Sequence, residues 1–335
     1  MTGLRPLTPD QVRRWVRHAQ SSPLYTHLIE VIAGDDRLMK VLNRIEHTPR
    51  PNVLLAGVQY LMMRDGGGDL ARHYPNLSDG DAPLSGVDGP FKRFVASHRE
   101  ELIDIGRTRY TQTNECRRCA VLLPAIWETS LSRFHLIDVG TSAGLNLVLD
   151  RYRYRWDGLE WGPPDSPVVL RAGSRGRGLA PRDIEVLSRI GLDLNPIDPN
   201  DPDDRLWLEA LIWPEHEERR RRLRAALELA STIEMRLVAG SALETLGPAL
   251  DGLAPGEPAV VMHSFALNQF SPAEKQQIEV ILENAREGRP VHRISFEMVD
   301  KDDESAQLGV DDGCGPVLIG QGHHHGEWVE LYALP

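Results

Sequence analysis

Cysteine is scarce in this sequence, which excludes one way of stabilising a fold. Three cysteines in 335 residues are too few for a disulfide framework. Cys116 and Cys119 form a C-x-x-C pair, and a zinc site would need two further ligands, which Cys314 and one of His323, His324 or His325 could supply. That second pair is irregularly spaced. We therefore interpret Cys116 and Cys119 as ordinary helix residues and predict no metal, with zinc as the alternative.

Long apolar runs and an excess of basic charge are also lacking. No segment approaches the roughly 18 apolar residues that span a bilayer. The N-terminal MTGLRPLTPDQ has no apolar core of the signal-peptide type, so we expect a cytoplasmic protein without a membrane partner. The net charge of −11 argues against non-specific binding to nucleic acid. A small-molecule substrate is the expected partner, and the oligomeric state stays open.

The chain changes character near residue 132. Up to that point, helical spacing of apolar residues and N-cap signals predict a series of helices. Beyond it, strands and helices alternate, which predicts a mainly parallel sheet with helices on both faces. The end of the chain has the pattern of an antiparallel hairpin. We therefore expect an α/β fold with a helical N-terminal domain over residues 1–132 and a sheet domain over residues 133–335.

The individual elements follow from the same patterns. Expected helices of the first part are 10–19, 25–33, 37–45, 53–63, 91–106 and 115–131. Expected strands of the second part are 135–139, 167–171, 235–239, 259–263 and 291–296, with a hairpin over 317–333. Helices are expected between these strands at 145–153, 182–189, 205–229, 242–250 and 272–287.

The segment FHLIDVGTSAGLNLVLDRY, residues 134–152, carries the strongest functional signal. It reads as a strand, a turn of small residues and the start of a helix, an arrangement that faces a ligand in many α/β proteins. The turn, Gly140 to Gly144, matches the G-x-S-x-G nucleophile elbow of α/β-hydrolases. Ser142 would then be the nucleophile, with Asp300 or Asp311 as the acid and one of residues 323–325 as the histidine.

The context of the turn argues against a hydrolase. The turn follows the first expected strand, whereas a hydrolase elbow follows several strands and needs an oxyanion loop after an earlier one. Asp138, at the end of the strand, has no role in that mechanism. A dinucleotide fingerprint is excluded by the glycine count, because Ser142 and Leu145 stand where G-x-G-x-x-G requires glycine.

A third interpretation accounts for more residues. The pattern of apolar strand, Asp138, glycine turn and helix resembles the first motif of class I S-adenosylmethionine-dependent methyltransferases. Over nearly the whole chain, the sequence is also similar to the domain-of-unknown-function 2332 family. The segments that carry this similarity are SSPLY (21–25), RPNVLLAGVQYLMMR (50–64), QTNECRRCAVLLPA (112–125), the glycine-turn segment, GLDLNPID (191–198) and GHHHGEWVEL (322–331).

The resemblance implies a fold, a cofactor and a set of contact residues. The fold is Rossmann-like, a mainly parallel sheet with an antiparallel C-terminal hairpin, and the cofactor is S-adenosyl-L-methionine. The glycine turn would lie under the methionine part of the cofactor, and the acid before it would interact with the cofactor's ammonium. The implied contacts are Asp138, Gly140, Ser142, Gly144 and Asn146.

Two further cofactor contacts are expected at the ends of later strands. The resemblance implies an acid after the second strand that holds the ribose hydroxyls. Asp193 is the candidate, whereas a second strand at 167–171 offers no acid. Ser241 follows the strand 235–239, where the adenine is usually contacted through a Gly-Asp-Ala sequence; here the serine replaces the acid.

Candidate catalytic residues come from two other segments. His263 ends the strand 259–263, at the carboxyl edge where substrate groups collect, and could act as a general base; a histidine that only orients a loop is the alternative. Asn114, Glu115 and Arg117 form a polar cluster at the start of an apolar helix. Capping explains Asn114, which is also a candidate cofactor contact. Glu115 could meet the cofactor, and Arg117 an acidic acceptor.

The sequence thus predicts an S-adenosylmethionine-dependent methyltransferase that acts on an unidentified, small-molecule acceptor. Two alternatives stay open: an α/β-hydrolase that uses Ser142, and a protein that binds S-adenosylmethionine without catalysis.

Overall fold

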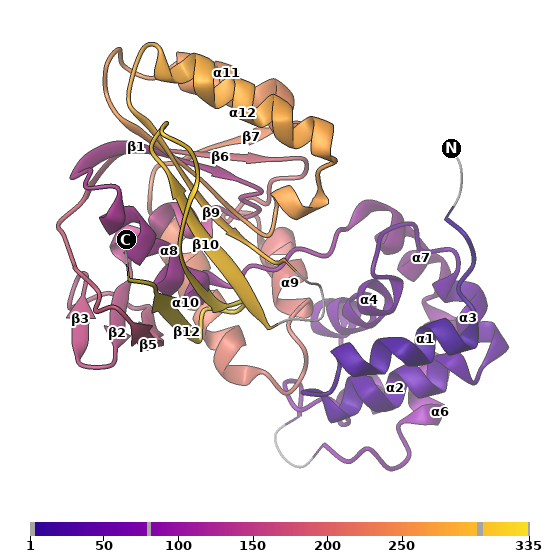
Figure 1. Ribbon diagram of the computed structural model, residues 1–335. Helices are drawn as coiled ribbons and strands as arrows, with labels where there is room; N and C mark the ends of the chain where they lie inside the picture. The colour runs from indigo at the N-terminus through magenta and orange to yellow at the C-terminus, as the bar shows by residue number, and fades with distance from the viewer. Residues whose placement is uncertain (1–3, 79–81, 300–303, 334–335) are drawn as a thin grey trace. The chain divides into compact units, whose positions relative to one another are not determined.

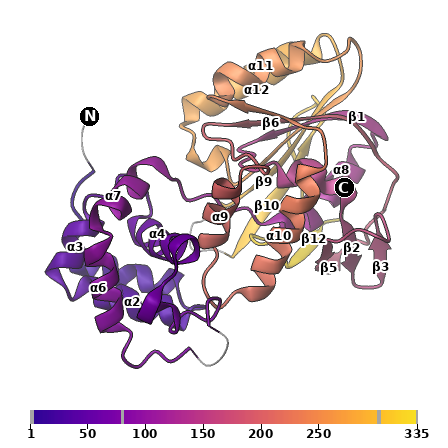
Figure 2. The same ribbon diagram turned by 180° about the vertical axis from the view of Figure 1, so that it is seen from behind.

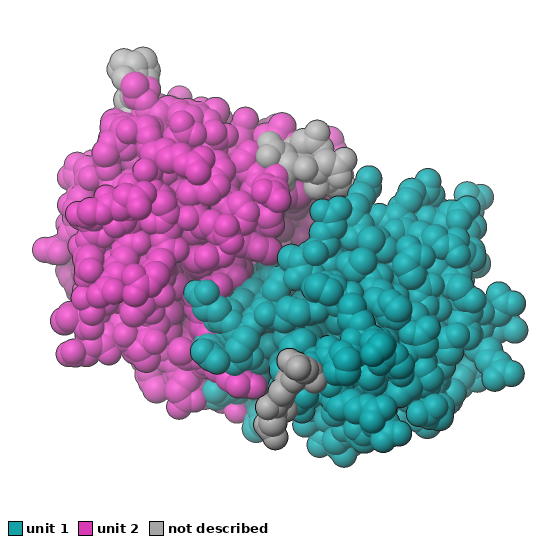
Figure 3. Space-filling view, turned by 90° about the horizontal axis from the view of Figure 1, so that it is seen from below, with its two compact units in different colours: residues 1–113, 201–221 teal, residues 114–200, 222–335 magenta. Residues whose placement is uncertain are grey.

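The computed structural model describes residues 4–78, 82–299 and 304–333. The chain forms two compact units, coloured separately in Figure 3. Unit 1 comprises residues 1–113 and 201–221, and unit 2 comprises residues 114–200 and 222–335. The boundary expected at residue 132 is not the boundary of these units, because residues 114–132 belong with the sheet and residues 201–221 with the helices. No helix within the described ranges has the length and apolar character to cross a membrane.

Unit 1 is helical, as expected (Figure 1). Side-chain caps begin several of its helices: Thr8 forms a capping box with Gln11, and Ser22 and Asp35 accept hydrogen bonds from first-turn amides. Its helices are α1 (Pro9–Arg14), the 3-10 helix η1 (Trp15–His18), α2 (Pro23–Ala33), α3 (Asp36–Leu42), α4 (Arg50–Asp65), α5 (Gly68–Ala71), α6 (Asp88–Ser97), α7 (Arg99–Thr108) and α9 (Pro202–Ala210). The single helix expected at 91–106 is two helices, α6 and α7, because the backbone of His98 leaves the helical region.

Helix α4 is the central element of unit 1. Every residue from Arg50 to Met62 is buried, which is the pattern of a helix surrounded by protein on all sides. Gln59 connects this helix to a distant part of the chain: its side-chain amide donates to the carbonyl oxygens of Ala210, at 2.8 Å, and Ile212, at 2.7 Å. These bonds tie the inserted segment 201–221 to the N-terminal helices.

Unit 2 is built on a nine-stranded sheet with the order β5-β12-β11-β10-β9-β8-β1-β6-β7. The strands β7, β6, β1, β8 and β9 run parallel to one another. The pairs β9–β10, β10–β11 and β11–β12 are antiparallel, and the edge strand β5 pairs with β12 in parallel. This confirms the expected α/β fold with N-terminal helices, a mostly parallel sheet and antiparallel C-terminal strands. The strand bounds are β1 (Arg133–Val139), β5 (Gly173–Gly176), β6 (Glu185–Asp193), β7 (Arg236–Ala239), β8 (Ala259–Ser264), β9 (Val291–Glu297), β10 (Ser305–Asp311), β11 (Val317–His323) and β12 (Trp328–Leu331).

Helices cover both faces of this sheet (Figures 1 and 2). Helices α11 (Ala242–Asp251) and α12 (Pro272–Arg286) pack on one face, and α8 (Cys119–Glu128), preceded by the 3-10 helix η2 (Cys116–Arg118), packs on the other. Successive β1 residues alternate between the faces: Ile137 and Val139 enter the apolar core beneath α11 and α12, whereas Asp138 contacts Asn146. Helix α10 spans Glu217–Ser231, and the 3-10 helix η4 spans Leu267–Gln269.

Two expectations for this region were wrong, and a third was right about the strand but not about its sheet. The helix expected at 182–189 is the start of β6, which pairs with β1 and β7. The strand expected at 167–171 is present as β4 (Val169–Arg171), but it lies in a separate sheet with β2 (Arg153–Trp156) and β3 (Leu159–Trp161). The helix expected at 145–153 is the kinked 3-10 segment η3 (Leu145–Arg151), where Tyr152 and Arg189 donate to backbone carbonyls. In each case long-range partners outweigh local propensity.

Replacing Gln59 with leucine tests the tie within unit 1. Leucine has a similar volume but no donor, so the Ala210 carbonyl loses its side-chain partner in a buried site. We expect Gln59→Leu to lower the free energy of unfolding by about 2 kcal/mol, measured by urea denaturation. Gln269→Leu, at an exposed position, is the control and should change stability little. Equal stability of the two variants would contradict the assigned bonds.

Candidate functional site

The sheet has a switch point at β1. Strands β6 and β7 lie on one side of β1, and β8 and β9 lie on the other. In open α/β sheets, ligands bind beyond the carboxyl ends of the strands where the order reverses. At this edge the structure brings together Asp138, the Gly140–Gly144 turn, Asp193 and His263, all from unit 2.

The turn after β1 requires its two glycines. Gly140 and Gly144 have φ values of 79° and 72°, a region that disfavours other residues. A Cβ atom on Gly140 would lie 2.6 Å from the Cβ of Ala266, and one on Gly144 would lie 2.5 Å from the sulfur of Met235. Ser142 also has a positive φ, 50°. The turn is therefore a tightly packed, specifically shaped loop.

The backbone donors of the turn are all engaged internally. Each N–H group from residue 140 to residue 144 has an acceptor in unit 2. Gly140 and Thr141 donate to Leu192 O (2.8 and 3.3 Å), Ser142 to Asp193 Oδ2 (2.8 Å), Ala143 to Asn114 Oδ1 (3.3 Å) and Gly144 to Thr141 O (3.0 Å). Binding of a phosphate or another oxyanion needs free N–H donors. In this turn every N–H group of residues 140–144 already has an acceptor.

The hydrolase partners of Ser142 are not brought together. The Ser142 hydroxyl accepts from Asn114 Nδ2 at 2.9 Å, and within the described ranges no histidine is hydrogen-bonded to it. The Ala143 N–H, which would serve an oxyanion hole, bonds Asn114. Asp311 pairs in register with Arg293 near the start of β9, at the opposite edge of the sheet. Asp300 lies outside the described residues.

Asp138 is a buried carboxyl with an unsatisfied oxygen. Its side chain is 1% exposed. One oxygen accepts from Asn146 Nδ2 at 3.4 Å, whereas Oδ1 and the nearby Thr141 Oγ1 have no hydrogen-bond partner. Burial raises the pKa of Asp138 to about 7, and the neighbouring Thr141 and Asn146 side chains lower it by less. A donor or cation placed at this point would satisfy a carboxylate that the protein leaves unpaired.

Asp193 stands beside Asp138 on the next strand. It ends β6, the direct parallel neighbour of β1. One carboxylate oxygen accepts from Ser142 N and the other from Asn195 N, both at 2.8 Å. The strand next to β1 thus ends in an acid. Ser241 follows β7 and caps helix α11 by accepting from Leu243 N at 3.3 Å.

His263 forms a dyad with a residue that the sequence analysis missed. His263 is 4% exposed, and its Nδ1 lies 2.7 Å from Glu297 Oε1, at the end of β9. Because a carboxylate accepts, we assign the proton to Nδ1, which leaves Nε2 as a lone-pair nitrogen; Nε2 and Ser264 Oγ are buried without partners. Burial raises the pKa of Glu297, but the hydrogen bonds that it accepts from His263 and from the backbone N–H groups of Leu267 and Ala266 outweigh burial, so the pKa is lowered. Glu297 could have been found in the sequence as an acidic residue at the end of an expected strand, the same pattern that pointed to Asp138.

Glu115 and Arg117 make contacts that organise the segment before α8. Glu115 is buried and forms a two-pronged ion pair with Arg222, at 3.1 and 3.2 Å, while accepting from Arg117 N. Arg117 donates to His325 O at 3.0 Å and to Glu327 at 2.7 Å. These are the contacts of positioning residues: they fix the segment from which Asn114 reaches the glycine turn.

Arg118 is a second residue that the sequence analysis missed. Its guanidinium lies 4.1 Å from the centre of the Phe265 ring, and its Nε donates to His324 O at 2.8 Å. Its positive charge lowers the pKa of Asp138. Arg117 and Arg118 are adjacent in η2, and the 3-10 geometry of this helix decides which of them faces Phe265. The local sequence does not reveal that geometry.

The cysteines do not form a metal site with the neighbouring histidines. Burial raises the pKa of the Cys116 thiol to about 12 and that of Cys119 well above its usual value. Cys314 is exposed. His324 Nδ1 bonds the Glu304 carbonyl at 2.9 Å. Throughout ranges 4–78, 82–299 and 304–333, no group of three or more potential ligands could hold an ion.

The fold and site define an α/β protein with polar side chains gathered at the switch point of its sheet. The chain belongs to the family described as "Uncharacterized protein conserved in bacteria (DUF2332)", whose model matches residues 10–331. No curated protein and no solved structure gives a significant match. The family similarity noted in the sequence is confirmed, and the resemblance to methyltransferases stays a prediction.

The raised pKa of Asp138 predicts a specific dependence of stability on pH. Between its usual value of 3.8 and about 7, the folded protein keeps a proton that the unfolded chain has lost. Stability should therefore fall as pH rises through this window and level off above it. Asp138→Asn removes this titration, so its melting temperature should fall less than that of the wild type between pH 5 and pH 8.

Thermal denaturation at several pH values measures this effect. Asp251→Asn, at an exposed position, is the matched control and should keep the wild-type pH dependence. The same dependence in Asp138→Asn as in the wild type would contradict the buried, proton-binding carboxyl.

Proposed function

We propose that the protein is an S-adenosylmethionine-dependent methyltransferase that acts on a small-molecule acceptor. The observation that carries the proposal is the chemistry of the switch point. Two carboxyl groups, Asp138 and Asp193, flank a glycine turn whose amide donors are already used. Such a site suits a ligand rich in donors and positive charge. S-adenosylmethionine presents an ammonium, a sulfonium and ribose hydroxyls, and it has no phosphate.

The residues present fit the two donor groups of the cofactor. The unsatisfied Asp138 Oδ1 and Thr141 Oγ1 would hold the ammonium, because a buried carboxylate is stabilised by a nearby cation. Asp193, at the end of the adjacent strand, would accept from the ribose hydroxyls. The cofactor would lie against Ser241 and the residues of the glycine turn, among them Gly140 and Gly144.

The strand arrangement supports the same proposal. The first strand stands in the middle of five parallel strands, and the C-terminal strands are antiparallel, as the resemblance to class I methyltransferases implies. The sheet departs from that expectation at its end: β10, β11 and β12 form a three-strand antiparallel extension in place of a single hairpin. The Rossmann-like assignment therefore depends on the parallel strands.

The chain's own residues would align the acceptor and remove its proton. When bound, S-adenosylmethionine supplies a methyl group activated by a sulfonium. His263 Nε2, held in one orientation by Glu297, would take the proton from an acceptor oxygen or nitrogen. Phe265, with Arg118 against its ring, would offer a flat apolar face to a planar group. The tight turn and the buried strand ends would keep water from the reacting atoms.

Calorimetry with S-adenosylhomocysteine tests the cofactor assignment. We expect saturable binding to the full chain, and a Kd about tenfold or more weaker in Asp193→Asn, because a hydrogen bond to a charged acceptor is lost. Asparagine keeps one oxygen, which can accept from Ser142 N, but loses the acceptor for Asn195 N. Circular dichroism and thermal melting would check that the variant is folded. Asp251→Asn, an equal loss of charge elsewhere in unit 2, should bind like the wild type.

Two results separate the proposal from its alternatives. The absence of heat at millimolar S-adenosylhomocysteine would overturn it. Covalent labelling of Ser142 by a serine-directed phosphonate would favour a hydrolase, and we expect no adduct. If Asp193→Asn binds S-adenosylhomocysteine as tightly as the wild type does, Asp193 is not a cofactor contact, but the cofactor assignment still holds.

A further inference from the structure

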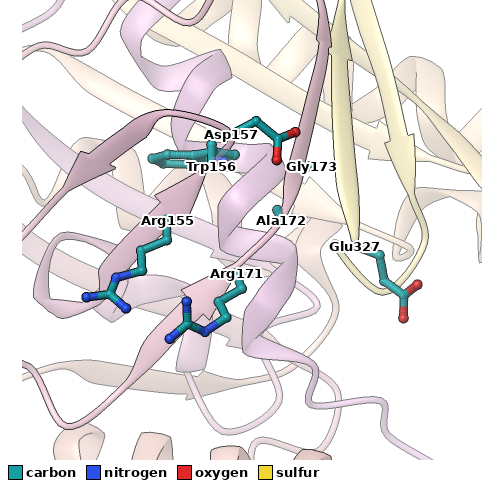
Figure 4. A pocket seen from close by; sticks show the side chains of 7 residues that line it. All are labelled: Arg155, Trp156, Asp157, Arg171, Ala172, Gly173 and Glu327. Atoms are coloured by element: carbon teal, nitrogen blue, oxygen red, sulfur yellow. The ribbon is translucent and has the colours of Figure 1, made fainter.

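A pocket of about 370 Å³ lies on unit 2, and none of its lining residues belongs to the switch-point cluster (Figure 4). It is lined by the small sheet of β2 and β4, by the start of β5 and by Glu327. A second pocket, of about 530 Å³, lies near Asp150 and Trp161. The first pocket is distinguished by its charges.

Two arginines of like charge stand side by side in this pocket. Strands β2 and β4 pair in parallel with Arg155 opposite Arg171. Figure 4 shows both side chains reaching toward the same side, with their guanidinium groups close together. Like charges on paired strands destabilise a sheet unless something compensates them.

The acid beside these arginines compensates them only in part. Glu160 pairs with Arg155, at 2.9 Å, and also with Arg153, at 2.7 Å. Arg171 is exposed, and the described part of the chain gives it no ion-pair partner. One carboxylate therefore serves three guanidinium groups, and a surplus of positive charge remains on this face.

The two acids that line the pocket do not remove this surplus. Asp157 accepts from Ser174 N at 2.9 Å, and Glu327 accepts from Arg117 at 2.7 Å. In Figure 4 the carboxylates of Asp157 and Glu327 lie apart from the two guanidinium groups. Glu327 is thus paired with Arg117, and the Asp157 carboxylate, which keeps its charge, accepts from a backbone N–H group away from the two guanidinium groups.

We propose that Arg155 and Arg171 form a binding site for a small oxyanion, a phosphate or carboxylate group on a small molecule. Guanidinium groups bind both kinds of oxyanion through paired, charge-assisted hydrogen bonds. The bound anion would relieve the repulsion between the two strands. This site goes beyond the proposed methyltransferase function and shares no residue with the switch-point cluster, so either assignment can fail without the other.

Thermal melting of the full chain with inorganic phosphate, citrate or sodium chloride at equal ionic strength tests the site. We expect the wild type to be stabilised more by phosphate or citrate than by chloride. In chloride, Arg171→Gln should melt about 1 °C higher than the wild type, because the like-charge pair is gone. The extra stabilisation of the wild type by phosphate or citrate should be absent in this variant. Calorimetry should show oxyanion affinity weakened about tenfold or more.

Arg236→Gln is the matched control, because Arg236 is exposed on β7 and carries the same charge. It should keep the wild-type response. A response to phosphate alone assigns a phosphoryl group, one to citrate alone assigns a carboxylate, and one to both assigns the shared oxyanion chemistry. Equal melting of the wild type in all three salts, or an undiminished oxyanion response in Arg171→Gln, would overturn the proposal.

Discussion

The hydrogen bonds that Asp193 and Asn114 make to the glycine turn are the interactions on which the site depends. Ser142 has a positive φ of 50°, which is strained for a residue other than glycine. The loop keeps its shape because a carboxylate accepts from Ser142 N and a side-chain amide bridges Ser142 Oγ and Ala143 N. These two side chains come from opposite sides of β1 in the sequence. They engage the N–H groups of Ser142 and Ala143, and backbone carbonyls engage the other three N–H groups of the turn.

The buried polar residues around the turn are of two kinds: those whose polar atoms satisfy one another, and those that keep an atom without a partner. Glu115 and Arg222 satisfy each other, and Arg189 pairs with Asp150 inside the same unit, so these residues stabilise and position. Asp138 and His263 each keep one buried polar atom without a partner. Such atoms cost free energy in a folded protein. Four of these atoms, Asp138 Oδ1, Thr141 Oγ1, His263 Nε2 and Ser264 Oγ, lie near the carboxyl ends of β1 and β8, and they support the binding site that we propose there.

The sequence predicted those parts of the fold whose signal is local. Strands β1, β8 and β9 are short apolar runs ended by polar residues, and helices α2, α4 and α12 show helical spacing. β6 was missed because residues 182–189 also have helical spacing, and its identity as a strand comes from pairing with β1 and β7. Asp193 was found as a candidate, but the strand that brings it beside Asp138 was not. Glu297 and Arg118 were missed because their partners lie far away in the sequence.

By itself, the sequence determined the family, the α/β class and the glycine turn, because composition, spacing and the demand for glycine are properties of neighbouring residues. Only the tertiary structure decided what the turn presents to a ligand. Whether Ser142 meets a histidine or Asn114, and whether the turn's amides are free or engaged, depends on strand order and on side chains from distant segments. The physical reason is that hydrogen-bond satisfaction and desolvation are fixed by packing, which no local pattern specifies.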